Sequence, residues 1–338
     1  VFGFAFAAVC GFLLSATPTW SGGQPIKGRQ LGIIVGAWIA GRAAMWLDAT
    51  LHTWLVALFD LALIPALTVA LWPVLTSPKS RKNLIFLIVL GAFFAANLMF
   101  HFETSALSEG TALGGLTLGV HLLALLIVIV IGRIVPTFIA VERLATEGPK
   151  PPLSSPALEW LAIVSVALVL ASDLIDHEAA WVGLLALAAA AIQIVRILKW
   201  RAGRLLFKPQ LAALHVGYAW IITGLALMGF AYLDGPVPVV SALHAITVGG
   251  VGTIILAVMS IVSLLHTGRP AKIHPLVILA YMLVSSAALL RTLAPIIFFE
   301  SYQEALIISG ALWACAFGIF VAVYWKILTT PRPDGIPG

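Results

Sequence analysis

The chain has 338 residues, of which 61% are hydrophobic and only 10% are charged, and its mean hydropathy is +1.08. A soluble domain carries about 25% charged residues, so this composition excludes an ordinary water-soluble globule and places the chain in a lipid bilayer. The formal net charge is +5, but the basic residues form no patch with interleaved aromatic residues, which excludes nucleic acid as a partner.

Eleven apolar segments of the sequence are long enough to cross a membrane as helices. A bilayer core about 30 Å thick needs about 20 apolar residues in helical conformation, because every backbone amide has to be satisfied within the segment. In chain order we predict spans at residues 1–19, 31–47, 54–75, 83–102, 113–136, 157–176, 180–200, 211–233, 241–265, 274–295 and 304–328. The sequence therefore predicts an all-α, polytopic membrane helix bundle.

The connections between the predicted spans alternate in charge. Lysine and arginine occur in every second connection, at Lys27 and Arg29; Lys79, Arg81 and Lys82; Arg143 and Lys150; Lys199, Arg201, Arg204 and Lys208; and Arg269 and Lys272. The connections between these carry acidic residues and neither lysine nor arginine, at Asp48; Glu103 and Glu109; Asp176 and Glu178; Asp234; and Glu300. By the positive-inside rule the basic connections are cytoplasmic, and so is the C-terminus.

A proline-rich connection, residues 140–156, divides the predicted spans into two sets. The first half, residues 1–139, holds five spans. The second half, residues 157–328, holds six spans and is followed by a cytoplasmic tail, residues 329–338. Because the chain opens at Val1 inside an apolar pattern, we expect one more helix upstream and twelve spans, six plus six, in the intact protein.

Ionisable residues within the spans are candidates for function, because charges at membrane depth are costly. Arg42 and Asp60 lie at similar depths, about 8–9 Å from one surface, on consecutive antiparallel spans. We predict a structural ion pair between them, since neutralising pairs are the usual way in which intramembrane charges are accommodated. Arg291 has no acidic neighbour in its own span, and its planar set of donors suits an anionic group such as a haem propionate.

Histidines form the most informative set of candidates, because imidazole is a common ligand of haem iron and copper. In the cytoplasmic half of the bilayer we expect His215 and His266 to be haem ligands. Next to His215, Gly217 lets either a flat macrocycle or a neighbouring helix come close. Each histidine also has an ordinary alternative, an interfacial imidazole bonded to a carbonyl or to water.

A second set of histidines is expected near the outer face. His101, His121 and His244 are candidate ligands for copper or for a second haem. His244 and His266 are 22 residues apart in one span, about 33 Å along a helix, so the two sets cannot serve one metal. The remaining histidines, His52, His177 and His274, are expected in loops.

Motifs distributed over most of the chain resemble those of the NnrS family. They are Phe2-Gly3-Phe4 with Gly11-Phe12-Leu13-Leu14, Trp38 with Gly41-Arg42, Asn97-Leu98-Met99-Phe100-His101, Gly132-Arg133-Ile134-Val135-Pro136, Leu214-His215-Val216-Gly217-Tyr218, Leu243-His244-Ala245 with Thr247-Val248-Gly249, and His266-Thr267-Gly268-Arg269-Pro270. Members of this family are bacterial inner-membrane proteins associated with haem, copper and defence against nitric oxide.

The resemblance implies a haem, expected to be b-type, and copper in a protein that binds or turns over nitric oxide and protects against nitrosative stress. Redox activity would need an electron donor that the sequence does not identify. Two other classes fit the pattern of spans. One is a secondary transporter of six plus six spans; the other is a non-catalytic membrane subunit of a respiratory or photosynthetic complex.

Overall fold

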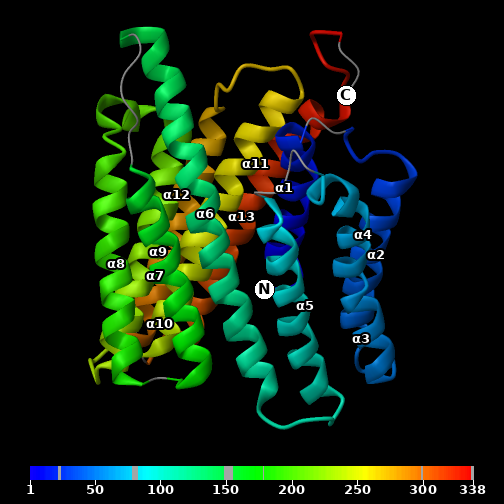
Figure 1. Ribbon diagram of the computed structural model, residues 1–338, viewed down its shortest axis with the longest axis vertical. Helices are drawn as coiled ribbons and strands as arrows, with labels where there is room; N and C mark the ends of the chain where they lie inside the picture. Colours follow the sequence, from blue (N-terminus) through cyan, green and yellow to red (C-terminus); the bar gives the residue numbers. More distant parts are fainter. Residues whose placement is uncertain (22–23, 78–82, 148–154, 178, 298–299, 336–338) are drawn as a thin grey trace. The chain divides into compact units, whose positions relative to one another are not determined.

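The computed structural model describes residues 1–21, 24–77, 83–147, 155–177, 179–297 and 300–335 (Figure 1). Within these ranges every regular element is a helix. Several residues that carry the predicted linker and charge pattern lie outside the described residues: 148–154, 336–338, Lys79, Arg81, Lys82 and Glu178. The chain separates into two compact units, Val1–Leu123 and Ala124–Gly338.

The first unit is built from five helices and the start of a sixth. They are α1 (Phe4–Ser21), α2 (Arg29–Trp46), α3 (Thr53–Leu61), α4 (Leu63–Leu75), α5 (Ile85–Thr104) and the first part of α6 (Thr111–Glu147). Helix α4 packs against α1, α2 and α5, and α3 packs against α2 and α5. Helices α3 and α4 form one apolar stretch interrupted at Ala62. Pro65 lies just beyond this break, where its missing N–H removes a helical hydrogen bond.

The second unit contains the remainder of the chain. After the end of α6 come α7 (Pro156–Ile175), α8 (Ala180–Lys199), η2 (Gly203–Phe207), α9 (Pro209–Tyr232), α10 (Val239–His244), η3 (Ala245–Gly252), α11 (Thr253–His266), α12 (Pro275–Ile297) and α13 (Tyr302–Thr329). Helix α9 packs against α8, α10, η3 and α11, and α12 packs against α10, η3, α11 and α13. The π-helix η3 interrupts an otherwise α-helical span, and its hydrogen bonds run from residue i to i+5.

Nine helical stretches in the described part of the chain are long and apolar enough to cross a membrane. Helices α3 and α4 together form one of them, Thr53–Leu75, and α10, η3 and α11 form another, Val239–His266. The predicted number of eleven is not confirmed. Helix α1 is apolar over the shorter stretch Phe4–Thr17, and Arg29 and Arg42 reduce the hydropathy of α2.

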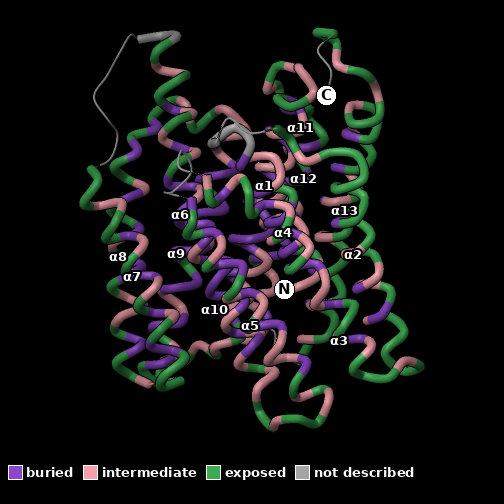
Figure 2. The backbone as a smooth tube through the Cα atoms, turned by 45° about the vertical axis from the view of Figure 1, so that its right-hand side comes forward, coloured by how far each residue is buried: buried purple, intermediate pink, exposed green. Residues whose placement is uncertain are grey.

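Large apolar side chains are exposed on the helices of both units. Val69 on α4, Ile88 on α5 and Ile307 on α13 are each about 70% exposed, and Figure 2 shows exposed residues recurring along the helices. Soluble proteins rarely present extended apolar surface of this kind, because its contact with water is unfavourable. The exposed surface and the apolar helices together identify a multi-pass membrane protein.

Helix α6 is longer than predicted. The span expected to end at Pro136 continues to Glu147, so the first residues of the predicted linker are helical. A proline inside a helix removes one hydrogen bond, but contacts beyond it hold the extension: Lys208 Nζ donates to Glu142 at 2.5 Å. The boundary between the two compact units, after Leu123, also falls within α6.

Candidate functional site

Asp60 is the centre of a buried polar cluster in the first unit. Arg42 donates from Nη2 to one oxygen of this carboxylate. Asn97 Nδ2 and His101 Nε2 each lie 3.0 Å from the other oxygen. Because a carboxylate only accepts hydrogen bonds, Nε2 of His101 carries the proton. The structure therefore contains the ion pair that the sequence predicts, and adds an amide and an imidazole to it.

Two glycines allow the backbone and side chains of this cluster to approach closely. A Cβ atom on Gly41 of α2 would lie only 3.0 Å from Asp60 Cα, so α2 and α3 touch at this residue. A Cβ atom on Gly3 would lie 2.7 Å from Arg42 Nη1. Trp38 Nε1 donates to the Gly3 carbonyl at 3.2 Å. The Phe-Gly-Phe and Gly-Arg motifs thus meet at one place.

His101 and His121, both predicted as outer ligands, lie at different levels of the first unit. Thr111 Oγ1 donates to the Met99 carbonyl, which places the first turn of α6 beside the end of α5 that carries His101. His121 is ten residues further along α6, about 15 Å from that level. Its Nδ1 lies 2.9 Å from the Thr117 carbonyl, so Nδ1 carries the proton.

His244, the third predicted outer ligand, belongs to the second unit and is bonded to Arg291. Its Nδ1 lies 3.2 Å from the Arg291 carbonyl, and Arg291 Nε donates to its Nε2 at 3.2 Å. The lone pair of Nε2 that would bind a metal is therefore used by a cation. Arg291 takes part in no ion pair with the described residues, which suits its predicted role of binding an anionic group.

A buried network around Arg196 of α8 is a feature that the sequence analysis does not find. Arg196 is fully buried and forms an ion pair with Glu159 of α7. Its Nη1 donates to the Val128 carbonyl at 2.8 Å and to Tyr218 Oη at 2.9 Å. Tyr218 in turn donates to Gln193. The available signal was the presence of an arginine and a glutamine inside the span predicted at 180–200.

Two motifs of the sequence analysis converge on Arg196. A Cβ atom on Gly132 of α6 would collide with the Arg196 guanidinium, which would have to move from its present position. Tyr218, at the end of the His-Val-Gly-Tyr motif, donates and accepts within the same network. The Arg196 guanidinium also lies 5.9 Å from the ring centre of Trp200, within the range of a cation–π contact.

His215 of α9 lies next to this network and presents a ring nitrogen that no described group engages. Its Nδ1 lies 2.7 Å from the Leu211 carbonyl, so Nδ1 carries the proton and Nε2 of the neutral ring keeps its lone pair. Nε2 is buried and has no hydrogen-bond partner among the described residues. Trp200 packs edge-on against the ring, with centroids 5.5 Å apart, and its own Nε1 is also buried without a described partner.

The tautomer and the orientation of His215 are compatible with metal ligation. Ligating histidines generally donate their second ring N–H to a carbonyl, which fixes the tautomer and the ring orientation. The neighbouring Gly217 resolves an alternative of the sequence analysis: its Cβ would meet Ile254, so it admits the neighbouring helix α11 at that point.

His266, the predicted partner of His215, is not at the same level. Because Gly217 faces Ile254, His215 lies level with residues near 256 of the antiparallel helix α11. His266 is about ten residues further on, about 15 Å away along the axis. It is exposed at the end of α11, where its carbonyl accepts from Arg332 at 2.9 Å. Two imidazoles that share one metal, with bonds of about 2 Å, need nearly the same level.

The described residues contain no group of three or more His, Cys, Asp or Glu side chains that could together hold a metal ion. A haem would not need three such side chains, because the porphyrin itself supplies four nitrogen ligands to the iron. His52, His177 and His274 lie outside the helices, between consecutive elements.

Comparison with known proteins gives one family. The sequence profile of a family described as NnrS protein matches residues 1–332, nearly the whole chain and parts of both units. No curated protein and no solved structure gives a significant match.

Proposed function

Because the chain belongs to the NnrS family, we propose that it is a bacterial inner-membrane protein that binds haem and nitric oxide and protects against nitrosative stress. Family membership is consistent with a membrane protein connected to nitric-oxide stress. The haem, the copper and the handling of nitric oxide are parts of the proposal. The proposed function includes both binding and turnover of nitric oxide, and turnover would draw electrons from a separate donor.

The observation that carries the haem proposal is the environment of His215. A buried imidazole nitrogen with a free lone pair and no described partner is unfavourable unless it binds something. The residues around it would suit an iron ligand: the Leu211 carbonyl holds the tautomer, and the edge of Trp200 restricts the ring plane. Arg291, which has no described ion-pair partner, is bonded to His244, and His244 lies near Gly224 of α9, more than 10 Å along the helix axis from His215. We therefore propose that Arg291 binds a propionate of the second haem expected near the outer face.

A haem in this position would supply ferrous iron, which binds nitric oxide. The protein's own contribution would be to orient the ring of His215 and to exclude water, since the neighbouring Trp200 is fully buried. Nitric oxide is small and apolar, so it reaches such a site from the bilayer without a polar channel.

The other candidate histidines differ in which ring nitrogen would bind a metal. His121 has the tautomer of a metal ligand, with Nδ1 donating to a carbonyl. His101 would use Nδ1, since its Nε2 donates to Asp60, and His244 would first have to release Arg291. Because the family resemblance implies copper and haem, each of these histidines is proposed as a copper ligand by itself and not as part of one shared site, since His101 and His121 lie about 15 Å apart along the helix axis. His266 is proposed as a ligand of a separate haem and not of the haem at His215, from which it lies about 15 Å away.

We place all eleven helical segments in the membrane, with α1 and α2 as the two shorter spans and the C-terminus in the cytoplasm. The support is the charge pattern of the connections, which the positive-inside rule converts into an orientation. Membrane lipids are then the partners of the exposed apolar side chains of α4, α5 and α13.

The haem proposal predicts a visible spectrum. Protein purified in detergent should show a Soret band that shifts on reduction with dithionite and again on addition of nitric oxide. His215→Ala should abolish or shift this band, because Nε2 is the proposed ligand. His52→Ala, which changes a histidine between α2 and α3, is the matched control and should leave the spectrum unchanged. Absence of a Soret band, or an unchanged spectrum in His215→Ala, would contradict the proposal.

A secondary transporter is the second candidate, favoured by interruptions in two spans. One is the break at Ala62 between α3 and α4, and the other is the π-helix η3. Transporters often bind substrate where helices are broken in both halves of the fold. Substrate flux into proteoliposomes, without any haem spectrum in the same preparation, would support this candidate over the first.

A further inference from the structure

Residues 199–208, which end α8 and lead into α9, present three cations at the surface of the second unit. Lys199, Arg201 and Arg204 are exposed, and none of them forms an ion pair with the residues that the structure describes. Arg269 of the following basic connection differs, because its Nη2 donates to Thr330 Oγ1 at 3.0 Å. The three cations of residues 199–208 therefore lack a described counter-ion.

The backbone of this basic segment is held in a defined conformation. Arg201 has a φ of +48°, a left-handed conformation that residues other than glycine rarely adopt. Its carbonyl accepts a hydrogen bond from Arg143 Nη2 of α6. The residues on either side, Trp200 and Ala202, are buried. These fixed neighbours leave the Arg201 side chain at the surface.

Two large apolar side chains are exposed beside the cations. Phe207, the last residue of η2, is 88% exposed, and the adjacent Leu206 is also exposed. The helices on both sides, α8 and α9, are long and apolar enough to cross a membrane, so the basic segment lies where acyl chains meet water. At this level apolar side chains enter the edge of the bilayer, while neighbouring cations stay among the lipid head groups.

We propose that the basic segment binds an anionic phospholipid, with the phosphate at Arg201 and Arg204 and the acyl chains against Phe207. A guanidinium donates two parallel hydrogen bonds to a phosphate group. Each lysine or arginine near a membrane surface also strengthens the attraction to anionic lipids. The inference goes beyond the proposed function and requires neither haem nor copper.

The exposed apolar side chains favour a lipid over a free anion or a soluble acidic protein. Inorganic phosphate would neutralise the cations but leave Phe207 uncovered. A soluble acidic partner would approach from the aqueous side, whereas the ring lies at the edge of the bilayer. A phospholipid carries a charged head group and apolar chains in one molecule, so it satisfies both parts of the segment.

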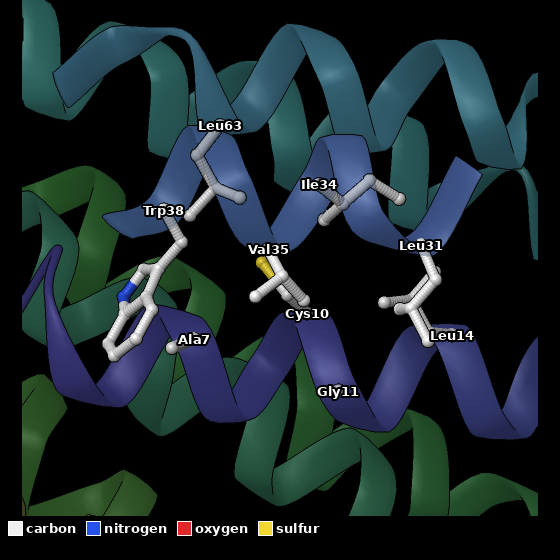
Figure 3. A pocket seen from close by; sticks show the side chains of 9 residues that line it. All are labelled: Ala7, Cys10, Gly11, Leu14, Leu31, Ile34, Val35, Trp38 and Leu63. Atoms are coloured by element: carbon white, nitrogen blue, oxygen red, sulfur yellow. The ribbon is translucent and has the colours of Figure 1, made fainter. Parts of the chain in front are cut away.

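The apolar pocket between α1 and α2 in the first unit is a contrasting surface. It has a volume of about 220 Å³ (Figure 3). Among the described residues, no charged side chain lines it, and the indole N–H of Trp38 on its wall already donates to the Gly3 carbonyl. Nothing on this wall distinguishes one head group from another. We therefore expect selectivity for an anionic lipid to come from the basic segment.

Replacing two cations tests the head-group site. The measurement is native mass spectrometry of the full chain in detergent, with added dioleoylphosphatidylglycerol or with dioleoylphosphatidylcholine, which has the same acyl chains. The unsubstituted chain should bind the anionic lipid about tenfold more tightly. Arg201→Gln combined with Arg204→Gln should remove this preference. Both side chains are exposed, so the double variant should fold.

Lys27→Gln combined with Arg29→Gln is the matched control. These two cations are also exposed and belong to another basic connection, so the control loses the same charge and should keep most of the preference. An equal loss in both double variants would indicate a diffuse effect of net charge and overturn the site. Equal binding of the two lipids by the unsubstituted chain would also overturn it and leave the cations to a soluble acidic partner.

A further variant tests the apolar part of the segment. Phe207→Ser should weaken the binding of both lipids by a similar factor, because the ring contacts the acyl chains that they share. Unchanged binding of both lipids would overturn this contact. Displacement of phosphatidylglycerol by a tenfold molar excess of inorganic phosphate would identify a site for the free anion and overturn the lipid. None of these results involves the Soret band, so failure here is distinguishable from failure of the haem proposal.

Discussion

Replacing Glu159 with alanine should lower the free energy of unfolding by about 3–5 kcal/mol, because Arg196 would stay buried without its anionic partner. The Arg196 side chain is 1% exposed. Its other contacts, the Val128 carbonyl and Tyr218, are neutral and cannot balance its charge. The measurement is loss of helicity, followed by circular dichroism, as the purified protein is titrated with denaturing detergent.

The control for this prediction is an exposed ion pair in the same unit. Lys208→Ala removes the ion pair between Lys208 and Glu142. The Lys208 side chain is 41% exposed and the Glu142 side chain is 32% exposed. Exposed pairs contribute about 1 kcal/mol or less, so this variant should unfold nearly as the parent does. Glu159→Gln retains an acceptor and should fall between the two. Equal stability of Glu159→Ala and Lys208→Ala would show that Arg196 does not need its partner.

Replacing Asp60 with alanine should destabilise the first unit by about 3 kcal/mol, the lower end of the range for a buried ion pair. The carboxylate accepts from Arg42, Asn97 and His101, and all three donors would lose their partner together. The lower end applies because the Arg42 side chain is 29% exposed, so water can replace part of the lost interaction. Detergent unfolding again gives the measurement.

A double variant separates the charge from the packing in this cluster. Arg42→Met combined with Asp60→Leu removes both charges and keeps similar side-chain volume. It should be more stable than Asp60→Ala alone, because no uncompensated cation remains near the membrane interior. If the double variant loses as much free energy of unfolding as Arg42→Met and Asp60→Leu lose together, the two residues do not interact energetically.

The Arg42–Asp60 pair could be predicted because it depends only on local information. The two residues lie on consecutive helices, and helical rise alone places them at one depth. The addition of His101 could not be predicted in this way, because it depends on how α5 is rotated against α3. That rotation is set by side-chain packing between the two helices, which leaves no simple trace in the order of residues.

The Arg196 network escaped prediction for a different reason. Arg196 lies four residues before the end of the predicted span and close to the basic residues Lys199 and Arg201, so its charge is read as part of a basic connection. What buries it is the absence of a side chain at Gly132, on a helix that is distant in sequence. Gly132 lies on α6 and Arg196 on α8, so the relation between the two residues becomes visible only when the helices are seen in contact.

The predicted histidine pair shows the limit of counting levels along a sequence. His215 and His266 are both predicted in the same half of the bilayer, but a half-bilayer is about 15 Å thick, the same as the axial separation that follows from the contact between Gly217 and Ile254. The tautomer of His215, by contrast, follows from the carbonyl one turn before it in its own helix. The sequence thus specifies which nitrogen of His215 carries the proton, but not which residues lie beside the ring.

The π-helix η3 sets the direction, around the helix axis, in which every later side chain of its span points. Wide turns accommodate one residue more than α-helical turns do, and one residue corresponds to about 100° of rotation in an α-helix. Ile254, two residues after η3, fits against Gly217 only at the azimuth that η3 provides. An insertion or deletion of one amino acid in η3 would therefore rotate α11 by about 100° around its axis. The side chains of α11 that now pack against α9 would then point elsewhere.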